Sequence, residues 1–157
     1  MVRIDIRPYR AEDRDRLINL FRDSVRQVAR RDYSHEQVRA WAPDDINAEG
    51  FGRRRADKAT FVAVADGGLA GFADLEPDGH IDMLYVHAGH QAKGVARALL
   101  DHVETLARRR GIGRLHTEAS ITARPVFERR GFQILAVQTV MLGGQAFTNC
   151  RMEKHLV

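Results

Sequence analysis

Apolar and polar residues alternate along the chain with two different periods, and each change of period marks a predicted element. Residues 2–6 alternate apolar and charged side chains and stop before Pro8, which predicts a first strand. Apolar residues then recur at helical spacing between residues 12 and 31. The chain therefore opens with a strand and an amphipathic helix.

Two shorter helices are predicted next. Ser34 and Gln37 have the spacing of a capping box, in which each side chain bonds the backbone N–H of the other residue. Val38 and Trp41 supply the apolar face of the helix that follows, and residues 46–55 predict a further helix from a weaker pattern.

Strand periodicity returns at residue 60. The turn residues Asp66-Gly67-Gly68 lie between two apolar runs and predict a hairpin. Pro77-Asp78-Gly79 predicts a second turn, which leads into a strand over residues 80–86. Residues 95–110 then carry apolar side chains at helical spacing.

The last third of the chain predicts a strand over residues 115–119, a helix over residues 122–130, and a hairpin of residues 134–142 and 146–152 around Gly143-Gly144. This order of elements predicts an α+β (α/β) fold, in which helices flank a mixed, mostly antiparallel central sheet. The βαβ repetition of a doubly wound dinucleotide fold is missing.

The length of 157 residues predicts one domain over residues 1–157. The chain starts without a basic leader before an apolar run, and no apolar run is long enough to span a bilayer. We therefore expect a soluble cytoplasmic protein with no membrane partner. Cys150 is the single cysteine, which excludes an intrachain disulfide and favours buried packing over a nucleophilic role.

The formal charge of +4 comes from 22 Arg and three Lys against 21 acidic residues. Clusters of arginine at predicted helix ends favour the helix dipole, and contact with an anion is the alternative. A nucleic-acid partner is not expected, because a recognition helix and an aromatic stacking platform are missing. The clusters are Arg53-Arg54-Arg55, Arg108-Arg109-Arg110 and Arg129-Arg130.

A loop with the sequence Gln91-Ala92-Lys93-Gly94-Val95-Ala96 joins the predicted strand over residues 80–86 to the helix after it. A Gly-containing turn at such a junction lets backbone N–H groups converge at the positive end of the helix. The loop therefore predicts a seat for the pyrophosphate of an acyl carrier.

Together with its surroundings, this loop resembles the GNAT superfamily of N-acetyltransferases. The matching features are the strand Ile81-Asp82-Met83-Leu84-Tyr85-Val86, the loop Gln91-x-x-Gly94-x-Ala96, and the segment from Ala119-Ser120 through Ala123 to Phe127-Glu128-x-x-Gly131-Phe132. The resemblance covers residues 60–157 and is most specific over residues 81–132. It implies a GNAT-like acyl-CoA N-acyltransferase fold in which two adjacent strands splay to admit acetyl-CoA.

The resemblance also implies how acetyl-CoA is held. The amides of residues 91–96 hold its pyrophosphate, and the backbone of residues 84–86 pairs with the pantetheine arm like an additional strand. Lys93 adds a cation or is merely exposed. The implied cofactor-binding residues are Leu84, Tyr85, Val86, Gln91, Ala92, Lys93, Gly94, Val95, Ala96, Arg97, Ser120 and Phe127.

Acyl transfer to a primary amine requires a base and an acid, because the amine, with a pKa of about 10, must lose a proton and the departing thiolate must gain one. The resemblance places a carboxylate before the loop, where His80 and Asp82 share a strand face, and a tyrosine where this chain has Phe127. Tyr85 is the nearest other hydroxyl, although packing is an alternative role for it. The expected catalytic residues are His80, Asp82 and Tyr85, with the N–H of Val86 facing the oxyanion.

The acceptor is expected to be a small-molecule or peptide amine. Residues 74–82 contain four carboxylates and no Lys or Arg, so they attract a cation or simply form a charged turn. Tyr33, Trp41 and Glu76 are the expected substrate-binding residues. We further expect Thr122 to cap the helix after it and Ser120 to contact the cofactor.

Three further expectations concern catalysis, metal binding and assembly. Since Phe127 replaces the usual tyrosine, a non-catalytic module that binds coenzyme A is the alternative to an enzyme. No metal is expected, because His87 and His90 lack a well-defined ligand set around them. The C-terminal hairpin offers an edge through which a homodimer could form.

Overall fold

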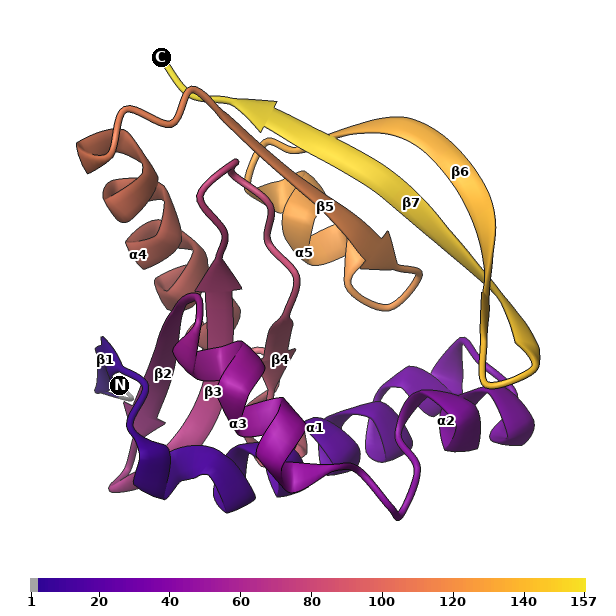
Figure 1. Cartoon of the computed structure of the whole chain (residues 1–157). Coiled ribbons are helices and arrows are strands. Elements are labelled where there is room, and N and C mark those ends of the chain that lie inside the picture. Colours follow the sequence, from indigo (N-terminus) through magenta and orange to yellow (C-terminus); the bar gives the residue numbers. More distant parts are fainter. Residues whose placement is uncertain (1–2) are drawn as a thin grey trace.

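The computed structural model describes residues 3–157 (Figure 1), so Val2, where the predicted first strand begins, lies outside the described part. The element order matches the predicted one. In chain order the helices and strands are β1 (Ile4–Pro8), α1 (Arg14–Gln27), α2 (His35–Trp41), α3 (Ala48–Ala56), β2 (Ala59–Ala65), β3 (Gly68–Leu75), β4 (Leu84–Val86), α4 (Val95–Arg109), β5 (Arg114–Ser120), α5 (Arg124–Arg129), β6 (Gln133–Leu142) and β7 (Gln145–His155).

The strands form two sheets rather than one continuous sheet. The four-stranded sheet has the order β1-β2-β3-β4, and the three-stranded sheet has the order β5-β7-β6. All strand pairs within the sheets are antiparallel, and one parallel bridge between His80 and His116 links the two sheets. The predicted α+β class with a mixed, mostly antiparallel sheet is confirmed, and the sheet is divided between β4 and β5.

The predicted strand over residues 80–86 is wrong in its first half, because regular pairing with β3 begins only at Leu84. The carboxylate of Asp74 on β3 causes the interruption. Its Oδ1 accepts the backbone N–H of Asp82 at 2.7 Å and that of Met83 at 3.2 Å, so a side chain replaces a ladder partner. His80 and Asp82 therefore do not share a regular strand face.

A buried ion pair holds this interruption in place. Arg55 on α3 donates from Nη1 to Asp74 Oδ2 at 2.9 Å, and both side chains are 0% exposed. The hydroxyl of Thr60 donates to the carbonyl of Arg55 at 2.7 Å, which fixes the end of α3. The segment that enters β4 thus depends on one buried carboxylate.

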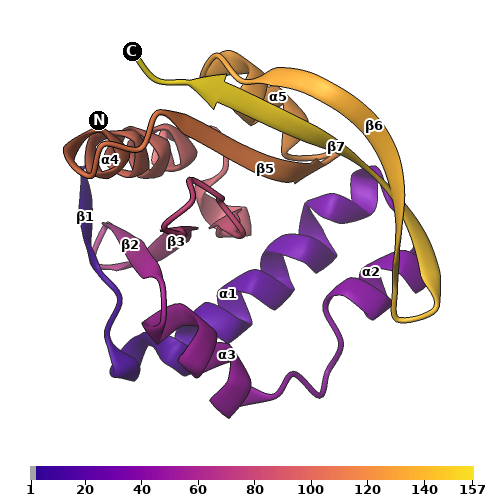
Figure 2. The same cartoon turned by 45° about the horizontal axis from the view of Figure 1, so that its top comes forward.

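Helices cover both faces of the four-stranded sheet (Figures 1 and 2). On β2 and β3, Val62 and Phe72 belong to the core under α1 and α3, whereas the adjacent Ala63 and Ala73 belong to the core under α4. This alternation follows from the period of two along a strand. Both layers therefore bury apolar surface against the same sheet.

The C-terminal hairpin bends over to α2 (Figures 1 and 2), where Gln37 Nε2 donates to the carbonyl of Ala146 at 2.7 Å. Its strand β6 lies at the edge of the three-stranded sheet and exposes Val137 and Met141 by 63% and 69%. Homodimer formation through this edge stays a prediction.

Cys150 is buried, as expected. Within residues 3–157, no helix combines the length and hydrophobicity needed to cross a bilayer.

Candidate active site

Three cavities lie in series where β4 and β5 separate. The loop cavity, of about 780 Å³, is lined by residues of the 91–97 loop together with Arg31 and Arg129. The middle cavity, of about 90 Å³, lies between α1, β4 and the start of α5. The inner cavity, of about 180 Å³, is lined by Trp41 and Glu118 among others.

Successive cavities share wall residues, so they form one groove. Val86, Gln91 and Ala96 line both the loop cavity and the middle cavity. Leu84, Tyr85 and Ser120 line both the middle cavity and the inner cavity. The groove begins beyond the His80–His116 bridge, where Thr117 Oγ1 still bonds the carbonyl of Ile81 at 2.8 Å.

The loop places backbone amides at the N-terminus of α4. Gly94 precedes the helix in the left-handed conformation at φ +84°, and Ala92 takes the same conformation at φ +61° despite its Cβ. Gln91 Nε2 donates to the carbonyl of Val86 at 2.9 Å, which ties the loop to β4. Residues on both sides of Gly94 line the loop cavity, which is where the sequence predicts the amide nest.

Arginines rather than Lys93 supply the positive charge of this cavity. Arg31, Arg97, Arg129 and Arg130 line it, whereas Lys93 is exposed and lies outside its wall. Arg130 is already paired with Asp101 and Glu104. Arg31 was missed by the sequence analysis, since it comes from the short turn after α1, about 60 residues before the loop.

The register of β4 decides which backbone groups face the groove. The pairs Asp74–Met83 and Ala70–His87 are hydrogen bonded at 3.2 and 2.7 Å. Because bonded and non-bonded pairs alternate in an antiparallel ladder, Tyr85 is bonded to Phe72 on β3. The backbone groups of Leu84 and Val86 therefore point to the β5 side, and those of Tyr85, which the sequence analysis included, do not.

Aromatic side chains form one wall of the inner cavity. The ring centroid of Trp41 lies 5.4 Å from that of Tyr33 and 6.2 Å from that of Phe147. The capping box of Ser34 and Gln37, present as predicted, fixes the start of the helix that carries Trp41. Tyr33 and Trp41 thus line the cavity, as expected from the sequence.

Two tyrosines line the inner cavity, and their hydroxyls have different partners. The hydroxyl of Tyr33 donates to the carbonyl of Thr148 at 2.7 Å and accepts the N–H of Ile121 at 2.9 Å. The hydroxyl of Tyr85 accepts Trp41 Nε1–H at 3.2 Å, which leaves its own proton for a further acceptor. Burial raises the pKa of Tyr85 above its ordinary value, so the hydroxyl is protonated at neutral pH.

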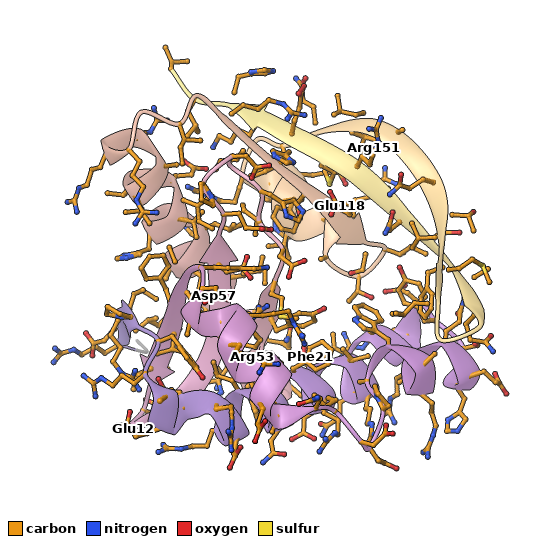
Figure 3. The ribbon with its side chains drawn as sticks, in the orientation of Figure 1. Glu12, Phe21, Arg53, Asp57, Glu118 and Arg151 are labelled. Carbon is orange, nitrogen blue, oxygen red and sulfur yellow. The ribbon has the colours of Figure 1, made fainter. Side chains whose placement is uncertain are left out.

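Two carboxylates line the inner cavity, and they differ in how they are paired. Asp82 lies 3.0 Å from Lys58 Nζ and 3.6 Å from Arg55 Nη2. Desolvation raises the pKa of Asp82. The hydrogen bond from Lys58 and the positive charges of Lys58 and Arg55 outweigh this effect and keep the pKa of Asp82 below its ordinary value. Asp82 is therefore a weaker base than a free carboxylate. Glu118, on β5, was missed by the sequence analysis (Figure 3).

His80 lies behind Glu118, between two carboxylates. Its Nε2 is 2.8 Å from Glu118 Oε1, and its Nδ1 is 2.5 Å from Glu76 Oε1. Desolvation lowers the pKa of His80, but the two carboxylate bonds outweigh it and raise the pKa above its ordinary value. Neither His80 nor Glu76 lines the inner cavity. His80 contacts a residue of the cavity wall, Glu118, and Glu76 contacts His80.

At the start of α5 the expected capping by Thr122 is wrong, and Ser120, which also lines the groove, supplies the cap. Ser120 Oγ accepts the backbone N–H of Ala123 at 3.0 Å and thereby caps the turn, while Thr122 Oγ1 donates to Asp32 Oδ2 at 2.8 Å. Phe127 is 2% exposed, packs against Phe132 at 5.0 Å between centroids, and lines the inner cavity. The side chain at this position therefore reaches the cavity without a proton to donate.

The chain was compared with known proteins. Residues 29–154 match the family model described as the acetyltransferase (GNAT) domain. The chain is 35% identical over 152 residues to the uncharacterized N-acetyltransferase YafP of Escherichia coli K12, which covers 97% of this chain and 96% of YafP. The chain belongs to the GNAT family. It is an acetyl-CoA-dependent N-acetyltransferase, as the sequence predicts, and the non-catalytic alternative is not supported.

Other acetyltransferases resemble the chain in sequence or in fold. A GCN5-related N-acetyltransferase from Rhodopseudomonas palustris superposes with a TM-score of 0.92 at 37% identity, over 97% of this chain and 95% of that chain. YncA of Salmonella typhimurium, solved with acetyl-CoA, has the same fold, with a TM-score of 0.74 at 17% identity over 99% and 95% of the two chains. Streptothricin acetyltransferase of Streptomyces lavendulae is 35% identical over 66% of this chain and 61% of its own length.

Proposed function

We propose that this GNAT enzyme transfers acetyl from acetyl-CoA directly to a primary amine in a ternary complex, with the amine in the inner cavity. The observation that carries the proposal is the continuous groove. Its loop end is basic and rich in amides, its inner end is aromatic and acidic, and the two ends meet at Leu84, Tyr85 and Ser120. A long anionic carrier and a cationic acceptor fit opposite ends of such a groove.

Acetyl-CoA lies along the groove from the loop inwards. The amides of residues 91–96 and the positive end of α4 hold the pyrophosphate, and Arg31 and Arg97 add charge. The carbonyl of Leu84 and the N–H of Val86 pair with the pantetheine amides, while the carbonyl of Val86 stays bonded to Gln91 Nε2. This arrangement places the thioester beside Tyr85, at the entrance of the inner cavity.

The acceptor arrives as an ammonium ion and must lose a proton before it attacks. Asp82 and Glu118 attract it, and the carboxylate of Glu118 accepts the proton. His80, bonded to Glu118 and Glu76, fixes the orientation of that carboxylate. Glu118 thereby takes the role that the sequence analysis gave to His80 and Asp82, and His80 becomes a positioning residue.

Transfer then needs one bond formed and one broken. The amine nitrogen attacks the thioester carbonyl carbon, and the N–H of Leu84, which lines the inner cavity, bonds the oxyanion in place of the N–H of Val86. As the tetrahedral intermediate collapses, the C–S bond breaks and the thiolate takes the proton of the Tyr85 hydroxyl. The products are the N-acetylated amine and free coenzyme A.

Replacing Tyr85 by phenylalanine tests the acid. We expect Tyr85→Phe to lower kcat by about 10-fold, a modest loss because a thiol pKa near 8.5 makes thiolate a tolerable leaving group. Adding Phe127→Tyr in the same protein supplies a hydroxyl to the inner cavity and should restore most of kcat. The control Tyr9→Phe removes a hydroxyl outside the groove and should change nothing. An unchanged kcat in Tyr85→Phe would show that water supplies the proton.

The proposed reaction is tested by release of free thiol from acetyl-CoA in the presence of single amines. The panel should contain alkyl monoamines, diamines, amino sugars and short peptides with free α-amino or ε-amino groups. We expect turnover with at least one cationic amine and a product heavier by one acetyl group in the mass spectrum. Tight binding of acetyl-CoA without turnover on any amine class would contradict acetyl transfer to an amine.

A further inference from the structure

Two histidines and a glutamate meet beside the inner cavity, although they are far apart in the sequence. His80, His116 and Glu118 each offer one ligand atom, and these three atoms lie within 4.8 Å of one another. The His80–His116 backbone bridge holds the two imidazoles side by side, with ring centroids 5.1 Å apart. The cluster is therefore built into the junction of the two sheets.

The spacing fits a transition metal after small side-chain movements. Zinc bound to imidazole nitrogen and carboxylate oxygen at about 2.0–2.2 Å requires neighbouring ligand atoms roughly 3.3 Å apart in tetrahedral geometry. His80 Nε2 and Glu118 Oε1 are already 2.8 Å apart. His116 Nε2 has only a loose contact, 3.6 Å from Asp78 Oδ2, so the ring can turn towards the ion.

The surroundings of the cluster also favour a cation. Glu76 Oε1 lies 2.5 Å from His80 Nδ1. Histidines that bind a metal through one ring nitrogen commonly bond a carboxylate through the other, which orients the ring. His80 Nε2 is thus left for the ion. Three carboxylates surround the two imidazoles, those of Glu76, Asp78 and Glu118. Within residues 3–157, the one Lys or Arg side chain within 4 Å of these carboxylates is Lys58, 3.6 Å from Glu76. A divalent ion would balance the remaining negative charge.

We propose that His80, His116 and Glu118 bind a divalent transition metal, with zinc preferred, and that the bound ion inhibits acetyl transfer. Two imidazoles and one carboxylate form a ligand set that zinc accepts, with water in the fourth position. The inhibition rests on the proposed function, because the ion would occupy the Glu118 carboxylate that receives the proton of the amine. The sequence did not predict this site, since His116 and Glu118 lie 36 and 38 residues after His80.

Binding is tested on the intact chain with ZnCl2 by calorimetry and with CoCl2 by visible absorption. We expect one ion per chain and the intense visible bands of four-coordinate cobalt. His116→Ala should weaken zinc binding by at least about 10-fold, and Glu76→Gln by about 10-fold or more through loss of the outer contact. The matched control His155→Ala removes a 69% exposed histidine outside the cluster and should leave the affinity unchanged. Circular dichroism verifies that each variant is folded.

Activity gives the second readout. ZnCl2 should inhibit thiol release by the unmodified enzyme, and His116→Ala should keep its activity while becoming at least about 10-fold less sensitive to zinc. Equal zinc affinity in the unmodified protein and His116→Ala, or no binding at all, would overturn the site. Binding at this cluster with undiminished turnover would overturn the inhibition. If no amine is acetylated, the proposed function fails, but the cobalt spectrum still decides the metal site.

Discussion

Replacing Glu118 by glutamine is expected to lower kcat by on the order of 10³-fold and to leave the affinity for acetyl-CoA unchanged. The carboxylate lines the inner cavity and is the base in the proposed reaction, whereas the cofactor lies along the loop and middle cavities. Glutamine keeps the size and the polar character of the side chain but cannot accept a proton from an ammonium ion. Steady-state kinetics and calorimetry with acetyl-CoA measure the two effects separately.

Glu128→Gln is the matched control for this experiment. Glu128 is 44% exposed, like Glu118, but it is paired with Arg124 on α5 and lies outside the wall of the inner cavity. The control should retain full activity. If Glu118→Gln turns over as fast as the unmodified enzyme, Glu118 is not the base, and Asp82→Asn would become the informative variant.

The second large effect concerns stability. Asp74→Ala is expected to lower the free energy of unfolding by about 3–5 kcal/mol, because it leaves the buried Arg55 guanidinium with only the more distant carboxylate of Asp82, 3.6 Å away. The substitution also removes the acceptor for the backbone N–H groups of Asp82 and Met83. Urea unfolding followed by circular dichroism and fluorescence gives the change in free energy.

Two further variants separate charge from packing at this position. Arg55→Met combined with Asp74→Asn removes both charges and keeps an amide oxygen as a backbone acceptor, so it should be clearly more stable than Asp74→Ala. Glu128→Ala breaks an exposed pair of similar length, 3.1 Å between Arg124 Nε and Glu128 Oε1, and should cost roughly 0.5 kcal/mol or less. A loss below about 1 kcal/mol in Asp74→Ala would contradict the structural role given to this carboxylate.

Local patterns were sufficient for much of the fold. Asp66 and Gly67 form the predicted turn with φ of +53° and +79°, and Ser34 and Gln37 form the predicted capping box. Each of these features depends on residues within a few positions of one another. The predicted strand over residues 80–86 was wrong in its first half because that part depends on residues farther away in the sequence. It depends on Asp74, eight residues away, and on Arg55, 19 residues further back.

Part of the candidate site also depends on consecutive residues, and part depends on residues far apart in the sequence. The loop end of the groove was predictable because the strand, the loop and the start of α4 are consecutive. The pairing of β4 with β3 was needed to show that the backbone groups of Leu84 and Val86, rather than those of Tyr85, face the groove. The inner cavity combines residues of α2, β5 and β7, so Phe147 and Asn149 gave no local signal. Glu118 could have been found, because Thr117 and Ala119 alternate into the core and leave it on the other face of β5.

Amide hydrogen exchange, measured by NMR with and without coenzyme A, tests whether the cofactor lies between β4 and β5. Binding of coenzyme A should slow exchange at Leu84, Val86 and residues 91–96. The amide of Tyr85, already bonded to β3, serves as the internal reference and should change little. Binding that leaves Leu84, Val86 and the loop unprotected, or protects other segments instead, would contradict this placement of the cofactor.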